Sequence, residues 1–151
     1  EFNSTGTGTF PTVQGVTNIN GSTKYFEHEK GVNEVDTAGN KTAIPAFIES
    51  GDFSLNPEGT NGEFFMSMRR FVPDFKTIQG NAQVTILLRD FPSDTEASSP
   101  LGPFTVTGST QKVDTRARAR FASLKIANTS TDENWRFGTF RADVQLDGMR
   151  G

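Results

Sequence analysis

Residues 135–146 read WRFGTFRADVQL, and this segment has the cleanest two-residue alternation in the chain. One face of the expected strand carries Gly138, Phe140, Ala142, Val144 and Leu146. The opposite face carries Phe137, Thr139, Arg141, Asp143 and Gln145. Because successive side chains of a β-strand point to opposite faces, this pattern predicts a strand with an apolar side and a polar side.

Shorter strands are expected upstream, at residues 24–29, 46–53, 64–72, 82–91, 104–107 and 115–127. Pro73 is expected to end the strand that begins at Phe64. Clusters of Gly, Pro, Asn and Ser separate these segments at intervals of about ten residues, and Pro and Gly interrupt every candidate helical window. The fold class predicted is all-β, an antiparallel, jelly-roll-like β-sandwich of about seven to eight short strands.

The segment 115–127 changes the parity of its alternation. Ala117, Ala119 and Phe121 share one face, whereas the apolar role then passes to Leu124 and Ile126. One extra residue in a strand produces such a shift, so the sequence predicts a β-bulge or bend near Ala122–Ser123.

The first forty residues have a different composition from the rest of the chain. Residues 3–23 are rich in Gly, Thr, Ser and Asn, and residues 31–40 are polar. Residues 1–41 are therefore expected to be a loosely ordered linker or strand remnant of an upstream domain, and residues 42–151 the sandwich domain.

Composition excludes several classes of protein. The chain contains no cysteine, which excludes a disulfide framework, a thiolate nucleophile and a cysteine-based metal site. The net charge of −3 is too balanced to suggest broad attraction to nucleic acid or to membranes. Apolar runs are also much shorter than a membrane span.

Candidate catalytic residues are few. His28 is the only histidine, and its neighbours Glu27 and Glu29 would point to the opposite face of a strand. The acidic pairs Glu49 with Asp52 and Asp90 with Asp94 are the best candidates for a two-carboxylate hydrolase. Such pairs are expected by chance among 18 acidic residues, so no enzyme, cofactor or metal site is predicted.

Arg116, Arg118 and Arg120 form a row on one face of an expected strand. Three roles are open: a site for phosphate, carboxylate or acidic glycan, an exposed face paired with acids such as Asp143, or a subunit interface. Trp135 has two possible roles, stacking on a sugar or capping the core at the start of its strand.

Four segments carry a resemblance to a known family: residues 43–53, 69–75, 116–120 and 135–148. Their sequences, AIPAFIESGDF, RRFVPDF, RARAR and WRFGTFRADVQLDG, resemble the C-terminal region of podovirus tail nozzle or tail tubular proteins. The resemblance covers about residues 25–150, and the closing Trp-Arg-x-Gly strand that runs into Asp-Gly-x-Arg is its most specific part. Where relatives often have Gly or Pro, this chain has Ala119 and Leu146.

The resemblance implies a virion structural protein located in the tail of a short-tailed phage. Its partners would be other tail subunits, in a homo-oligomeric ring, without a membrane or a specific nucleic acid. Arg116, Arg118, Arg120, Arg141 and Trp135 are the residues expected to contribute contacts. The alternative is a carbohydrate-binding, lectin-like module of a phage or bacterial surface protein.

Overall fold

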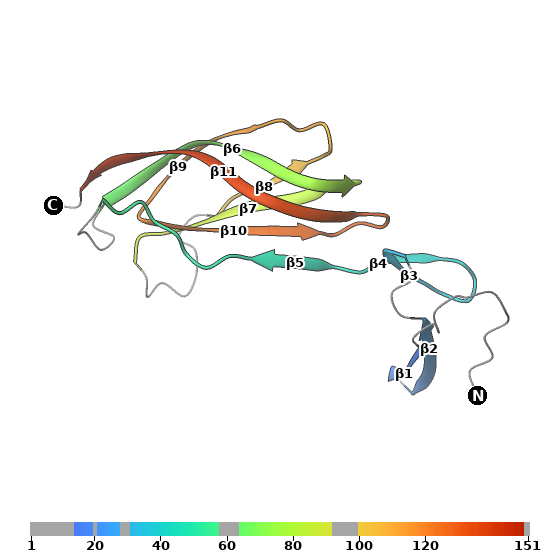
Figure 1. Ribbon diagram of the computed structural model, residues 1–151. Coiled ribbons are helices and arrows are strands. Elements are labelled where there is room, and N and C mark those ends of the chain that lie inside the picture. Colours follow the sequence, from blue (N-terminus) through green and yellow to red (C-terminus); the bar gives the residue numbers. More distant parts are fainter. Residues whose placement is uncertain (1–13, 20, 28–30, 58–63, 92–99, 150–151) are drawn as a thin grey trace. The chain divides into compact units, whose positions relative to one another are not determined.

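The computed structural model describes residues 14–19, 21–27, 31–57, 64–91 and 100–149 (Figure 1). Within these ranges every regular element is a strand in an antiparallel sheet, which confirms the predicted all-β class and the sandwich. No helix in the same ranges is long and apolar enough to cross a membrane. Contacts divide the chain into two compact units, Glu1–Gly31 and Val32–Gly151.

The first unit contains a β-hairpin. Strand β1 (Gln14–Ile19) pairs antiparallel with β2 (Ser22–Glu27), and Gly21 between them has a φ of 80°, a conformation that favours glycine. The structure thus has a strand, β1, where a linker was expected over residues 3–23. The sequence Asn20–Gly21 is a strong hairpin signal, but the polar composition around it obscured that signal.

Two sheets form the sandwich of the second unit. One has the order β5–β10–β7–β8 and the other β11–β6–β9. The first consists of β5 (Ala46–Glu49), β10 (Phe121–Asn128), β7 (Ala82–Arg89) and β8 (Leu101–Val106). The second consists of β11 (Asn134–Met149), β6 (Phe64–Gln79) and β9 (Val113–Ala119). The described part of the sandwich thus has seven strands, whereas a jelly roll has eight in two Greek keys.

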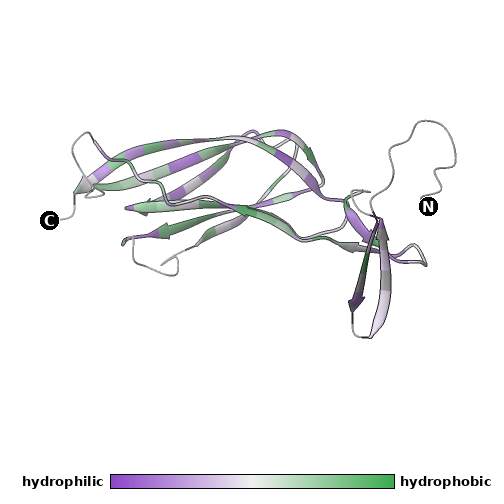
Figure 2. Ribbon diagram, turned by 60° about the horizontal axis from the view of Figure 1, so that its bottom comes forward, coloured by the Kyte–Doolittle hydropathy of each residue, from purple (hydrophilic) through white to green (hydrophobic). Residues whose placement is uncertain are grey.

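The core lies between the two sheets. Strand β7 alternates strictly and buries Val84, Ile86 and Leu88, as the sequence predicts. Phe71 of β6 is completely buried, and its ring centroid lies 5.7 Å from those of Phe104 in the other sheet and Phe140 of its own sheet. Figure 2 shows the hydrophobic residues distributed along these strands. Phe71 is thus an aromatic link between the sheets.

Strand β6 does not end at Pro73. It continues to Gln79, and Pro73 lies opposite Phe140 of β11. Strand β9 pairs with β6 only as far as Phe71, so Pro73 lies where β6 has a partner strand on one side only. A proline is tolerated where its missing N–H would face away from a neighbouring strand.

Of the bulge or bend predicted near Ala122–Ser123, the structure has a bend, at Arg120, and the pairing of β10 with β7 has no register shift at Ala122 or Ser123. Residues 113–128 form two strands in different sheets, β9 and β10, with Arg120 between them. Ala117 and Ala119 are buried on β9, and Leu124 and Ile126 are buried on β10. The parity changes because the chain crosses from one sheet to the other, which reverses the side that faces the core.

Strand β11 is irregular at Gly138. Phe137 lies opposite Phe75 and Thr139 opposite Asp74, so the register shifts between them. A Cβ atom on Gly138 would lie 2.7 Å from the carbonyl oxygen of Asp74, which only glycine allows. The shift moves Phe137 onto the core side, with its ring 5.6 Å from that of Phe75. The expectation that Phe137 shares the outer face with Arg141 is therefore wrong.

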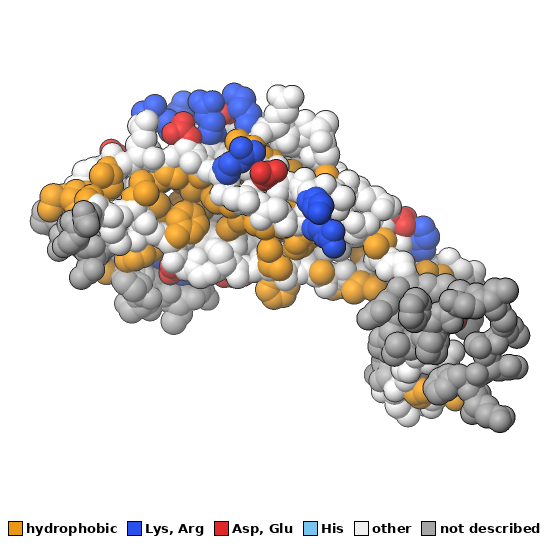
Figure 3. Space-filling view, viewed as in Figure 1, with side chains coloured by type: hydrophobic (Ala, Val, Ile, Leu, Met, Phe, Trp, Pro, Cys, Tyr) orange, Lys and Arg blue, Asp and Glu red, His pale blue; other side chains and the backbone are white. Residues whose placement is uncertain are grey.

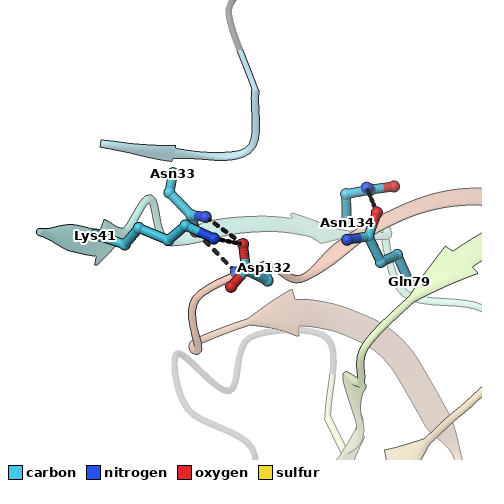
Figure 4. A network of polar contacts seen from close by, with 5 residues as sticks. All are labelled: Asn33, Lys41, Gln79, Asp132 and Asn134. Atoms are coloured by element: carbon cyan, nitrogen blue, oxygen red, sulfur yellow. Dashed lines mark hydrogen bonds and ion pairs between the residues drawn. The ribbon is translucent and has the colours of Figure 1, made fainter. Parts of the chain in front are cut away.

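A second hairpin belongs to the sandwich unit. Strand β3 (Asn33–Val35) pairs with β4 (Lys41–Ala43), although residues 1–41 were expected to be loosely ordered. Asn33 Nδ2 and Lys41 Nζ each donate to one carboxylate oxygen of Asp132 at 2.7 Å, and the Asp132 N–H donates to Asn33 Oδ1 at 2.8 Å (Figure 4). These bonds explain why the compact unit begins at Val32, ten residues before the expected boundary at residue 42.

Candidate interaction surface

The solvent-facing side of the β11–β6–β9 sheet is basic. Its cationic residues are Arg69, Arg70, Arg116, Arg118, Arg136 and Arg141. Its acidic residues are Asp74, Asp114, Asp143 and Asp147. We call this surface the arginine face, and Figure 3 shows blue side chains gathered over these strands. Basic residues outnumber acidic ones here, although the whole chain has 18 acidic and 15 basic residues.

Three of these arginines form ion pairs with aspartates on other strands of the sheet, and the pair of Arg118 on β9 with Asp147 on β11 spans the central strand β6. Arg118 Nε lies 2.7 Å from Asp147 Oδ2, and its guanidinium lies 4.1 Å from the centre of the Phe65 ring. Arg141 Nη2 lies 3.2 Å from Asp74 Oδ2. The third pair is Arg70 with Asp143, at 3.6 Å, so Asp143 does not pair with the predicted arginine row. All these side chains are about half exposed, and such pairs contribute at most about 1 kcal/mol each.

Arg69 and Arg116 differ from these paired arginines. Within the described residues, neither side chain forms a hydrogen bond or an ion pair, and both are exposed. They line a shallow groove of about 520 Å³ together with Arg118, Asp114 and Asp147. The acidic side chains beside them weaken the attraction of the groove for a polyphosphate, whereas a protein surface with both carboxylates and cations would match it.

Arg120 does not belong to the predicted arginine row. It lies between β9 and β10, and its Nη1 donates to the backbone oxygen of Asp90 at 3.1 Å. Its guanidinium also lies 5.9 Å and 5.6 Å from the ring centres of Phe91 and Phe121. Arg120 is half-buried and holds the turn between the two sheets, so it is not part of the arginine face.

Trp135 is half-buried at the beginning of β11. Its ring packs edge-on against Phe75, with centroids 6.2 Å apart, and both residues lie against the core. This position agrees with the role of a cap on the core, one of the two roles that the sequence leaves open. It does not support the other role, in which Trp135 is exposed and stacks on a sugar.

Glu49 and Asp52, the first of the acidic pairs considered for hydrolysis, have separate cationic partners. Asp52 lies 2.5 Å from Arg89, and Glu49 lies 3.9 Å from Lys125. Asp94 and His28 fall outside the described residues. No cluster of three His, Cys, Asp or Glu side chains that suits a metal ion occurs among the described residues.

The polar network around Asp132 serves the fold. Hydrogen bonds from Lys41 and then Asn33 lower the pKa of Asp132 below its usual value. The next residue, Glu133, is buried, and its carboxylate accepts the backbone N–H groups of Thr129 and Ser130 at 3.0 and 2.9 Å. Both carboxylates thus have structural partners at the turn before β11.

Neither a scan of the chain against models of known protein families nor a search among curated proteins gives a match. The resemblance to podovirus tail proteins therefore remains a prediction.

Proposed function

We propose that this chain is a non-enzymatic structural module of a tail subunit in a short-tailed phage, and that the arginine face makes contacts with neighbouring subunits. The observation that carries the proposal is the pair of exposed guanidinium groups of Arg69 and Arg116, which have no partner among the described residues. The tail location rests on the sequence resemblance.

A sheet face suits this role because its side chains are fixed by strand pairing. Arg116 and Arg118 are held two residues apart on β9, whose intervening Ala117 is buried. Arginine is enriched in interfaces because its planar guanidinium binds carboxylates through two hydrogen bonds. The mixture of free arginines and aspartates would then favour one register of contact over others.

The distribution of charge also fits a ring. The arginine face has an excess of basic residues, so the remainder of the chain is more acidic than the total of 18 acidic and 15 basic residues suggests. A contact between unlike surfaces of identical subunits generates a closed ring when the rotation closes. Such a head-to-tail contact is the arrangement we propose for the parent particle.

Charge reversal tests this proposal. Arg116→Glu removes an unpaired cation of β9 from the groove, and Lys76→Glu makes the same charge change at an exposed residue of β6 outside the groove. Each variant is supplied to a phage that lacks the gene, and particles with complete tails are counted by electron microscopy. We expect fewer complete tails with Arg116→Glu than with Lys76→Glu. Equal assembly by the two variants would contradict a role for the groove.

No observation favours the carbohydrate-binding alternative. The exposed aromatic residues among the described ones are Tyr25, Phe47 and Phe91, and these do not share a strand or a sheet face. A glycan array would revive this alternative if binding were found and were lost on Trp135→Ala.

A further inference from the structure

The open edge of strand β5 has the properties of a surface that pairs with a second copy of itself. Among the strands that the structure describes, β5 is the last of its sheet and has only β10 as a neighbour. All four of its residues are exposed, including Phe47 at 64% and Ile48 at 45%. An exposed apolar edge strand offers unpaired main-chain groups to another strand, and natural proteins seldom leave such an edge without protection.

The free hydrogen-bonding groups can be assigned by alternation. The N–H of Ser50 donates to the carbonyl of Leu124, and the N–H of Ala46 donates to the Asn128 side chain, so the even-numbered residues face β10. The N–H and C=O groups of Phe47 and Glu49 therefore point to the open side, because these groups alternate along a strand. Pro45, which precedes the strand, has no N–H to offer.

Ile48 provides an apolar contact at the same edge. It lies opposite Ile126, which is buried, so Ile48 points to the core side of the sheet. Its side chain is nevertheless 45% exposed, because β5 is at the margin of the sandwich. A strand added beside β5 would cover Ile48 and continue the core outward.

We propose that two copies of this chain associate through antiparallel pairing of their β5 strands around a two-fold axis. Phe47 of each copy then lies opposite Glu49 of the other, and Ile48 lies opposite Ile48. Each Phe47–Glu49 pair exchanges two main-chain hydrogen bonds, and the two Ile48 side chains meet at the closer, non-hydrogen-bonded position.

Charge complementarity supports the second copy as the occupant. Lys125 Nζ lies 4.8 Å from the centre of the Phe47 ring and 3.9 Å from Glu49 of its own strand. In the proposed register, Glu49 of the second copy lies beside Phe47 and hence beside Lys125. Two lysines and two glutamates, one of each from either copy, therefore alternate along the contact. Because the contact is two-fold symmetric, each β5 edge covers the other, and no free β5 edge remains for a third copy.

This inference concerns a different surface from the arginine face, so the two can fail separately. The association is measured by sedimentation of the full chain over a range of concentrations. We expect a dimer whose population rises with concentration, is lost with Ile48→Asp and is unchanged with Arg116→Glu. Sedimentation as a monomer at every concentration would overturn the proposal.

Disulfide trapping tests the register, because the chain contains no cysteine. Ile48→Cys places two thiols on residues whose Cα atoms would be about 4.5 Å apart, within the range of disulfides. Val35→Cys is the control, since Val35 is also exposed, at 57%, on a different sheet. We expect Ile48→Cys to cross-link roughly tenfold faster than the control, because pairing raises the effective concentration of its thiols.

A mixture of Phe47→Cys and Glu49→Cys chains should likewise form mixed disulfides faster than either chain cross-links to itself. A dimer in which Ile48→Cys reacts no faster than Val35→Cys would show that another surface is responsible.

Discussion

Replacing Phe71 with alanine tests the packing that links the two sheets. Phe71 is completely buried, and it contacts Phe104 and Phe140 at a centroid distance of 5.7 Å. Removing a buried Phe side chain costs about 3–5 kcal/mol, from lost burial and from the cavity that remains. Each aromatic pair adds about 0.5–1.5 kcal/mol beyond burial. We therefore expect Phe71→Ala to lower the free energy of unfolding by about 4 kcal/mol.

Urea unfolding followed by fluorescence measures this loss. Trp135 is the only tryptophan and is half-buried against Phe75, so its emission should report the unfolding of the sandwich. Phe47→Ala is the matched control, measured at low protein concentration, because its exposed side chain should cost no more than about 0.5 kcal/mol. Ile86→Val provides a milder change in the same core, with an expected cost of about 1 kcal/mol.

A loss of less than about 1 kcal/mol for Phe71→Ala would contradict tight packing between the sheets, because removing a fully buried side chain from a packed core costs more. Equal effects of Phe71→Ala and Phe47→Ala would contradict it as well. If Phe71→Ala fails to fold, the loss for Ile86→Val still decides whether this core is packed.

Three further predictions concern turns and bulges. Gly138→Ala should destabilise the sandwich by about 1–3 kcal/mol in urea unfolding, because its Cβ would clash with the backbone oxygen of Asp74. Glu133→Ala should cost about 1–3 kcal/mol in the same assay, since two backbone N–H groups lose their acceptor, and Glu133→Gln should restore part of that loss. The pKa of Asp132 is lower in the folded protein than its usual value. The ionised carboxylate therefore stabilises the fold at a pH above the usual pKa, and this stabilisation is lost as the pH falls through the lowered pKa. The urea midpoint of Asp132→Asn should therefore decrease less between neutral and acidic pH than that of the unmodified protein. An equal decrease in both proteins would show that the hydrogen bonds of Asp132 do not stabilise the fold.

The sequence predicts the strands that alternate strictly. Strand β7 and most of β11 were identified because a regular two-residue period requires only local information. A bulge and a crossing between sheets change the parity of alternation in the same way, so the alternation alone predicts a bulge or a bend near the crossing at Arg120. Only the pairing of β9 with β6 and of β10 with β7 distinguishes them.

The candidate surface was predicted in part. Arg116 and Arg118 lie on the outer face as expected from alternation with Ala117 and Ala119. Arg69 was missed because its contribution depends on the pairing of β6 with β9, which brings residues far apart in the sequence into one groove. No local pattern carries that information.

A cryo-electron microscopy reconstruction of the particle that carries this chain would show both the location of the chain and the neighbours of its arginine face. We expect the sandwich to lie in the tail, with Arg69 and Arg116 within reach of carboxylates on a neighbouring subunit. Finding the chain outside the tail, or in no virion, would contradict the proposed function. Finding it in the tail with the arginine face open to solvent would contradict the proposed contact.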